Sequence, residues 1–251
     1  GWNLISYIGD DAVALDDALP DDVELYFTDI ISENMVAVRD ENGQWLGSLA
    51  NVGWHQLEGY WVNVSDSLTF NFDTTDNLSL LINNEIVNYR INNVIQEFEY
   101  TQSQSQSFYY FKEVEINNST ITEDDWLIAY YNGVVIGARQ WFGSNTDVPA
   151  MGFDSFNETA SYAVDNSKIN FKVYQRSTGK LIDMHGDIPR WKNQSIFMVD
   201  RLQEKVTLPE NYSIDLPYPN PFNPMVNMKF TIPVEDHVKI IVYDLQGRII
   251  D

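Results

Sequence analysis

The sequence predicts an all-β protein of sandwich-like modules, jelly-roll or immunoglobulin-like in type, with one short helix near the amino terminus. Short runs rich in β-branched and aromatic residues recur along the whole chain. Asn, Asp, Gly and Ser residues separate these runs, as turn residues do. A single short stretch carries the apolar spacing of a helix.

The predicted strands follow from period-two patterns that end at turn residues. Asn132-Gly133 lies between two apolar runs and predicts a two-residue hairpin, and Asn42-Gly43 predicts a second one. The strand-like runs are residues 63–72, 108–116, 126–140, 169–174 and 238–243.

The predicted helix spans residues 10–19. Asp10 and Asp11 give it an acidic first turn, which suits the helix dipole. Apolar residues then recur at intervals of three to four, and Pro20 ends the pattern.

The 251 residues divide into three predicted modules. Residues 1–73 form a small, tryptophan-rich β module, and residues 74–205 form a larger β-sandwich domain. Residues 206–251 form a third block, which a proline-rich segment opens. We interpret this third block as a partial immunoglobulin-like domain.

Composition excludes several classes of function. With 15 Lys and Arg against 37 Asp and Glu, the formal net charge is −22, which disfavours nucleic acids and anionic lipid as partners. The absence of cysteine removes disulfides, thiolate nucleophiles and cysteine zinc sites. No apolar run reaches 18 residues, so we expect no membrane insertion.

The sequence offers little for catalysis. His55, His185 and His237 lie in different modules, and no G-x-S-x-G pattern of a serine hydrolase occurs. Among 37 acidic residues a glycosidase pair is conceivable, but adjacent pairs such as Asp124-Asp125 diverge on a strand. We therefore predict that the chain is not an enzyme, and a hydrolase is the least favoured alternative.

Two kinds of binding site are predicted as alternatives to plain surface and core. Acid and amide oxygens are concentrated in several loops, which suggests a structural calcium ion; the alternative is a solvated acidic surface. We expect no other cofactor. The aromatic residues Trp126, Trp141 and Tyr130 could form a platform for carbohydrate, although core packing is the favoured interpretation of them. The calcium candidates are Asp73, Asp76, Asn145, Asp147 and Asp154.

The most specific pattern is in the third block. A YPNPFNP segment is followed by an apolar run with Ile232-Pro233 and then by VKIIVYDLQGR. The residues of the motif are Tyr218, Pro219, Asn220, Pro221, Phe222, Asn223, Pro224, Tyr243, Asp244, Gly247 and Arg248. This block resembles the type A C-terminal sorting domain of the type IX secretion system.

The resemblance implies an immunoglobulin-like fold and a bacterial protein that is secreted and attached to the cell surface. Its prolines fix φ, so we expect an extended entry, with Phe222 anchoring the segment. Such domains continue for several strands beyond the GR pair, whereas this sequence stops three residues later. We therefore expect either a piece of a longer protein or completion by strands of another chain.

The first two modules resemble regions that commonly precede such sorting domains. Residues 1–6 (GWNLIS) and 58–62 (EGYWV) are similar to one of these, and residues 124–141 are similar to another. These regions carry no assigned catalysis. We therefore expect a non-catalytic accessory or adhesive region whose partners are the secretion machinery and the cell surface. The alternatives are a carbohydrate-binding module of a polysaccharide-degrading enzyme, and a subunit of a surface polymer linked by strand addition.

Overall fold

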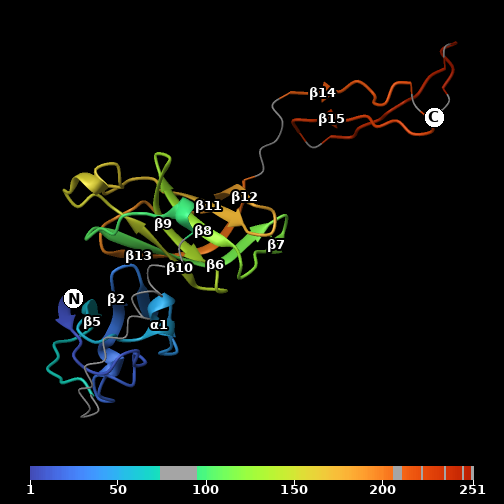
Figure 1. Cartoon of the computed structure of the whole chain (residues 1–251). Coiled ribbons are helices and arrows are strands. Elements are labelled where there is room, and N and C mark those ends of the chain that lie inside the picture. The colour runs from blue at the N-terminus through green and yellow to red at the C-terminus, as the bar shows by residue number, and fades with distance from the viewer. Residues whose placement is uncertain (74–94, 206–210, 222, 235, 245, 250–251) are drawn as a thin grey trace. The chain divides into compact units, whose positions relative to one another are not determined.

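The computed structural model describes residues 1–73, 95–205, 211–221, 223–234, 236–244 and 246–249, and it confirms the all-β prediction. By internal contacts the chain divides into two compact units, Gly1–Lys205 and Val206–Asp251. The division coincides with the boundary predicted at residue 206, while the first two predicted modules belong to one unit (Figure 1).

The first module is built on a five-stranded antiparallel sheet with the order β1-β5-β2-β3-β4. Its apolar face packs on a core that includes Trp54, Tyr60 and Phe27, all fully buried. Phe70 and Phe72, from the irregular stretch after the sheet, close that core with edge-on ring contacts. The strands are β1 (Trp2–Ser6), β2 (Phe27–Ile31), β3 (Val36–Arg39), β4 (Trp45–Leu46) and β5 (Gly59–Val64).

The predicted helix over residues 10–19 is wrong, because these residues form turns and one bridge between Val13 and Trp54. The apolar spacing instead buries Leu15, Ala18 and Leu19 in the core of the first module. The α-helix that the described residues do contain is α1 (Ser48–Val52). Three 3₁₀ turns complete the helical part, η1 (Glu24–Tyr26), η2 (Gln96–Phe98) and η3 (Asn157–Thr159).

The second module is one eight-stranded sheet with the order β10-β6-β13-β12-β11-β8-β9, with β7 paired to β6. The β8–β9 hairpin turns at Asn132 and Gly133, both at positive φ, as the sequence predicted. The strands are β6 (Gln106–Ile116), β7 (Ser119–Thr120), β8 (Trp126–Tyr131), β9 (Val134–Gln140), β10 (Thr146–Met151), β11 (Asn170–Gln175), β12 (Lys180–His185) and β13 (Ser195–Glu204).

This sheet curls so that β9 and β10, at opposite ends of its strand order, come together. A Cβ atom at Gly137 of β9 would lie 1.7 Å from the carbonyl oxygen of Pro149 in β10. Only glycine allows so close an approach, and proline suits a strand at the end of a sheet because it has no N–H to donate. The side chain of Arg139 supports the junction by donating from Nε to the carbonyl of Asp147, 3.0 Å away.

The first six residues of β6 are buried on both faces. Tyr109 and Phe111 point into the core of the eight-stranded sheet. Phe108 and Tyr110, which alternate with them, join a separate cluster with Ile31, Val36 and Val38 of the first module. The two modules therefore share an apolar interface.

The second unit contains one short pair of strands, β14 (Ser213–Ile214) and β15 (Phe230–Thr231). The predicted strand over residues 238–243 does not form a ladder in the described residues, and Tyr243 makes only an isolated bridge to Ile249. A strand requires a neighbouring strand to pair its backbone. Residues 238–243 therefore have the apolar alternation of a strand but do not form the predicted strand.

Candidate functional site

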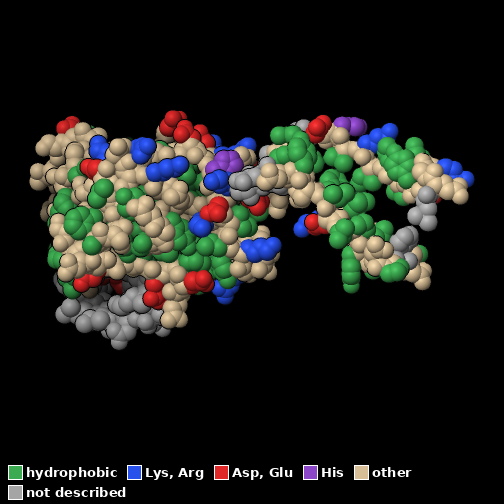
Figure 2. Space-filling model, turned by 90° about the horizontal axis from the view of Figure 1, so that it is seen from above, with side chains coloured by type: hydrophobic (Ala, Val, Ile, Leu, Met, Phe, Trp, Pro, Cys, Tyr) green, Lys and Arg blue, Asp and Glu red, His purple; other side chains and the backbone are tan. Residues whose placement is uncertain are grey.

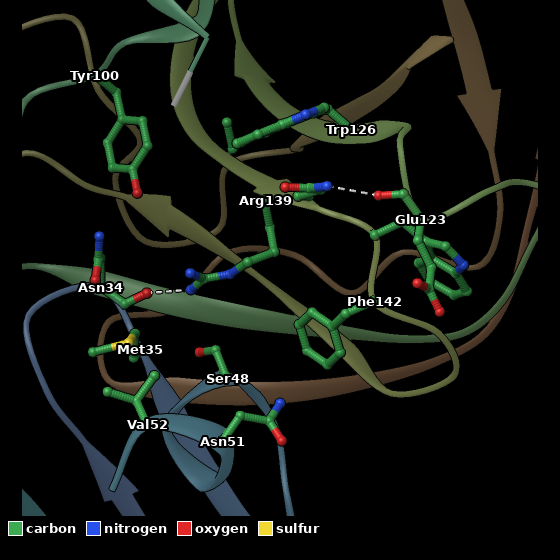
Figure 3. A pocket seen from close by; sticks show the side chains of 13 residues that line it. Asn34, Met35, Ser48, Asn51, Val52, Tyr100, Glu123, Trp126, Arg139 and Phe142 are labelled. Carbon is green, nitrogen blue, oxygen red and sulfur yellow. Dashed lines mark hydrogen bonds between the residues drawn. The ribbon is translucent and has the colours of Figure 1, made fainter. Parts of the chain in front are cut away.

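A cavity of about 330 Å³ lies where the two modules of the first unit meet. Figure 3 shows that α1 and the β2–β3 turn supply one wall, while β8, β9 and the segments beside them supply the other. The lining residues are Asn34, Met35, Ser48, Asn51, Val52, Tyr100, Glu123, Trp126, Ala138, Arg139, Gln140, Trp141 and Phe142. The sequence places these residues far apart, and the contact between the modules brings them together.

Arg139 occupies the centre of this cavity, and its side chain crosses from β9 toward Asn34 (Figure 3). Nε donates to the carbonyl of Asp147, and Nη2 donates to the carboxylate of Asp147, 3.1 Å away, and to the carbonyl of Asn34. The guanidinium is therefore held in one orientation by both modules. Its side chain keeps an exposed fraction of 17 %, so part of it faces the cavity.

Asp147 connects the modules from a fully buried position. Its carboxylate accepts the backbone N–H of Ser48 and the Ser48 hydroxyl, at 2.6 and 2.9 Å, besides the Arg139 bond. Burial of a charge is costly unless the charge is paired and hydrogen-bonded. Arg139 of the same module supplies the paired charge, and Ser48 of the first module supplies the other two hydrogen bonds, so Asp147 acts as an anchor between the modules.

Aromatic side chains form much of the cavity wall. Trp126 and Trp141 retain only 8 % and 3 % exposure, whereas Phe142 is 37 % exposed. Burial raises the pKa of Tyr100, against the opposing effect of the Arg139 cation and of hydrogen bonding by Asn34. Tyr100 is therefore a neutral phenol at physiological pH, able to donate and accept hydrogen bonds.

The predicted carbohydrate residues are placed in two different settings. Trp126 and Trp141 line the cavity, but they are buried and offer no open platform. Tyr130 is half-buried outside the cavity lining, and the ammonium of Lys172 lies 5.3 Å from its ring centroid. The exposed aromatic face at the cavity belongs instead to Phe142, which the sequence did not single out.

The predicted calcium ligands are engaged in other ways. The carboxylate of Asp147 is taken by Ser48 and Arg139, and that of Asp154 accepts the Thr159 hydroxyl and loop amides. This bonding, led by the Thr159 hydroxyl, lowers the pKa of Asp154. Asp73 is exposed and Asn145 half-buried, while Asp76 lies outside the described residues. Within the described ranges no group of three His, Asp or Glu side chains could hold a metal ion.

Two acidic residues have structural surroundings that the sequence did not indicate. The Nδ1 atom of His55 lies 2.7 Å from the carboxylate of Asp11, although 44 residues separate them. Asp125 is buried and accepts the amide and hydroxyl of Thr122 and the amide of Arg176. Asp124 beside it is exposed, and both residues lie in the turn before β8, not on a strand as expected.

The YPNPFNP segment of the second unit is not extended throughout. Tyr218 and Asn227 exchange two backbone hydrogen bonds, of 3.0 and 2.9 Å, so the chain doubles back between them. Phe222, the expected anchor, lies outside the described residues. Tyr218 is 77 % exposed, and Figure 2 shows apolar side chains along the second unit.

The YDLQGR motif forms a compact turn. The carboxylate of Asp244 accepts the amides of Gln246 and Arg248, and also the Arg248 Nε at 2.7 Å. These bonds, led by the Arg248 amide, hold the pKa of Asp244 below its ordinary value. Gly247 has a φ of 77°, which explains the glycine of the motif.

Comparisons with protein-family models, with curated proteins and with solved structures found no match to this chain. Among the helices of the described residues, none has the length and apolar character to cross a membrane.

Proposed function

We propose that this chain is a non-catalytic region of a secreted, surface-attached bacterial protein, and that residues 216–251 belong to its secretion-sorting signal. The carrying observation is the sequence motif of the second unit, and the exposure of apolar side chains in and beside it adds support. Leu216 is 91 % exposed, and Tyr218 and Met225 are each 77 % exposed.

The exposure of these residues favours recognition by another protein. Large apolar side chains that cluster on a surface commonly mark a site of protein interaction. The second unit also presents backbone that a partner strand could pair, since its described strands are only two residues long. A secretion machine that binds this segment would cover both the side chains and the backbone.

The first unit suits the role of a folded region carried by that signal. Its two sheets have dense cores and share an apolar interface, so it is held together by burial. In this proposal it serves as a spacer or binding region at the cell surface, and the secretion machinery and the surface attachment are the partners.

Export of the chain tests the proposal. The chain would be expressed with an N-terminal export signal in a bacterium that has a type IX secretion system, and in a strain lacking its outer-membrane pore. We expect surface labelling by antibody in the first strain and periplasmic retention in the second. Equal distribution in both strains would contradict the proposal.

A matched pair of variants separates recognition from folding. Replacing Tyr218, Asp244 and Arg248 together by alanine removes motif residues of the second unit, whose side chains are solvent-accessible or half-buried. The control replaces the exposed Phe156 of the first unit by alanine. Only the first variant should lose surface labelling, with both proteins retaining the same circular dichroism spectrum.

A further inference from the structure

We propose that the cavity around Arg139 binds a neutral saccharide unit, a role independent of the sorting signal. Asp147 and the shared apolar cluster fix the two walls of the cavity against each other. A site that needs no rearrangement avoids the ordering cost of binding.

The polar groups of the lining suit hydroxyls. The guanidinium of Arg139 is bound through Nε and Nη2, which fixes the direction of its remaining donors. Asn51 is an exposed lining residue on α1, and Gln140, on the opposite wall, donates from Nε2 to the Glu123 carbonyl, 2.8 Å away. Amide side chains both donate and accept, as a sugar hydroxyl does.

The apolar groups of the lining suit the face of a sugar ring. Phe142 offers the most exposed aromatic surface in the cavity, and Figure 3 shows its ring between the two walls. Met35 and Val52 complete the apolar side from the first module. A ligand with an apolar face and a polar edge matches this division, and a pyranose ring has both.

Charge restricts the ligand to an uncharged one. The Arg139 cation is neutralised by the carboxylate of Asp147, so it does not offer a free positive charge to an anion. Glu123 is exposed at the rim, and the chain carries a formal net charge of −22. Acidic sugars would therefore be repelled.

Volume restricts the ligand to a small one. The 330 Å³ of the cavity stands at the lower end of the range of roughly 300–1,000 Å³ for small-ligand pockets. The cavity therefore suits one or two sugar rings, at the end of a chain or as a branch.

Calorimetric titration of the whole chain tests the proposal. The probes are the methyl glycosides of glucose, galactose, mannose and N-acetylglucosamine, cellobiose and lactose, with glucuronic acid as the charged counterpart. We expect at least one neutral sugar to bind, and glucuronic acid to bind more weakly than glucose. Replacing Phe142 by alanine should weaken binding about fivefold to tenfold, because ring stacking is lost.

Three controls make the result decisive. Asn51→Ala should also weaken binding, whereas Phe142→Tyr should retain it. Phe156→Ala removes a 59 % exposed phenylalanine outside the cavity lining and should leave binding unchanged. Absence of binding by every neutral sugar, tighter binding of glucuronic acid, or binding insensitive to Phe142→Ala and Asn51→Ala would each overturn the proposal.

Discussion

Two turns of the molecule, one in each unit, have the same sequence pattern and the same hydrogen bonds. In residues 40–44 and 244–248 an aspartate carboxylate accepts the amides two and four residues later, at 2.8 Å in the first turn and 2.9 Å in the second. In both turns the glycine at the fourth position has a φ near 80° and donates to the aspartate carbonyl. The local chemistry of an Asp-x-x-Gly sequence therefore suffices to form this turn.

The strands that leave the two turns differ. The turn at Asp40 joins β3 to β4. The buried Tyr110 hydroxyl contacts both strands, at 3.3 Å from the Val36 carbonyl of β3 and 3.1 Å from the Leu46 carbonyl of β4. The turn at Asp244 is flanked by the isolated bridge between Tyr243 and Ile249, which are both exposed. The same turn therefore forms between strands that the buried Tyr110 contacts and between exposed residues, so its geometry is local.

The largest expected effect is the loss of stability caused by Asp147→Ala. This variant removes the carboxylate that binds Ser48 at the start of α1, just after β4. It leaves the Arg139 cation and the Ser48 polar groups in a buried site without their partner. Breaking one side of a buried pair costs about 3–5 kcal/mol. Urea unfolding of the first unit should show a loss of this size.

The matched control for Asp147 is Asp183→Ala. Its carboxylate pairs with Lys172 at 3.0 Å, but its side chain is 65 % exposed. Exposed pairs contribute less than about 1 kcal/mol. Similar losses for the two variants would contradict the anchoring role of Asp147.

A smaller loss is expected for Tyr110→Phe. The change removes the buried hydroxyl that contacts both strands of the first hairpin. An unsatisfied buried polar group costs about 1–3 kcal/mol. Urea unfolding measures the loss, and Tyr212→Phe, at a 64 % exposed position of the second unit, should leave the midpoint unchanged.

Substituting the two turn glycines compares the units directly. Gly43→Ala places a side chain at a φ of 80°, and Gly247→Ala does so at 77°. Gly43→Ala should destabilise the first unit by about 1 kcal/mol or more, whereas Gly247→Ala should leave the unfolding of that unit unchanged. Thermal unfolding followed by circular dichroism checks both, and an equal effect would show that the units unfold together.

The smallest expected effect concerns pH. The pKa values of Asp40 and Asp244 are both lowered, chiefly by the backbone amides of Gln44 and Arg248. The ordinary pKa of an aspartate carboxyl group is 3.8. A carboxyl group whose pKa is lowered in the folded state stabilises the turn at pH values above this ordinary pKa, and the contribution is lost as the pH falls through the lowered pKa.

Below pH 3.8 we therefore expect the amide of Arg248 to lose hydrogen-exchange protection, while that of Gln44 keeps most of its own. The Gln44 amide donates to the Asp40 side chain. The reason for the difference is that the adjoining β3–β4 pairs, up to Arg39 and Trp45, hold this amide beside the Asp40 oxygens when the carboxylate is protonated. Amide-proton NMR between pH 7 and pH 2 measures both. Equal loss of protection in the two turns would mean that the core adds nothing to the first.

Local signals predicted the turns well and the helix badly. Asn132-Gly133 forms the hairpin turn that the sequence predicted, with both residues at positive φ. Asn42-Gly43 also lies in a hairpin, but there residues 40–44 connect β3 to β4 in place of a two-residue loop, and Gly43 supplies the positive φ. The apolar spacing of residues 10–19 predicted a helix, but a core accepts the same side chains from successive turns. The spacing of apolar residues therefore predicts which side chains are buried better than it predicts the conformation of their backbone.

The candidate site was visible only in part. Trp126 and Trp141 were selected as aromatic residues, and the structure places both at the cavity, although buried. Arg139, Phe142 and Asn34 were not selected, because their role depends on two modules meeting. An arginine inside a largely apolar strand is a local signal that could have pointed to Arg139.

By itself the sequence determined the turns and most of the strands of the second module, since side-chain shape and backbone φ preference act over a few residues, whereas the strands predicted over residues 65–72 and 238–243 do not form. It also determined the acidic charge of the surface and the motif of the last block. Only the tertiary structure decided that β6 is buried on both faces and that Asp147 lies fully enclosed. Both facts arise because the first module packs on the outer face of β6 and Ser48 donates to Asp147. These contacts join segments that are far apart in the sequence, so no local pattern contains them.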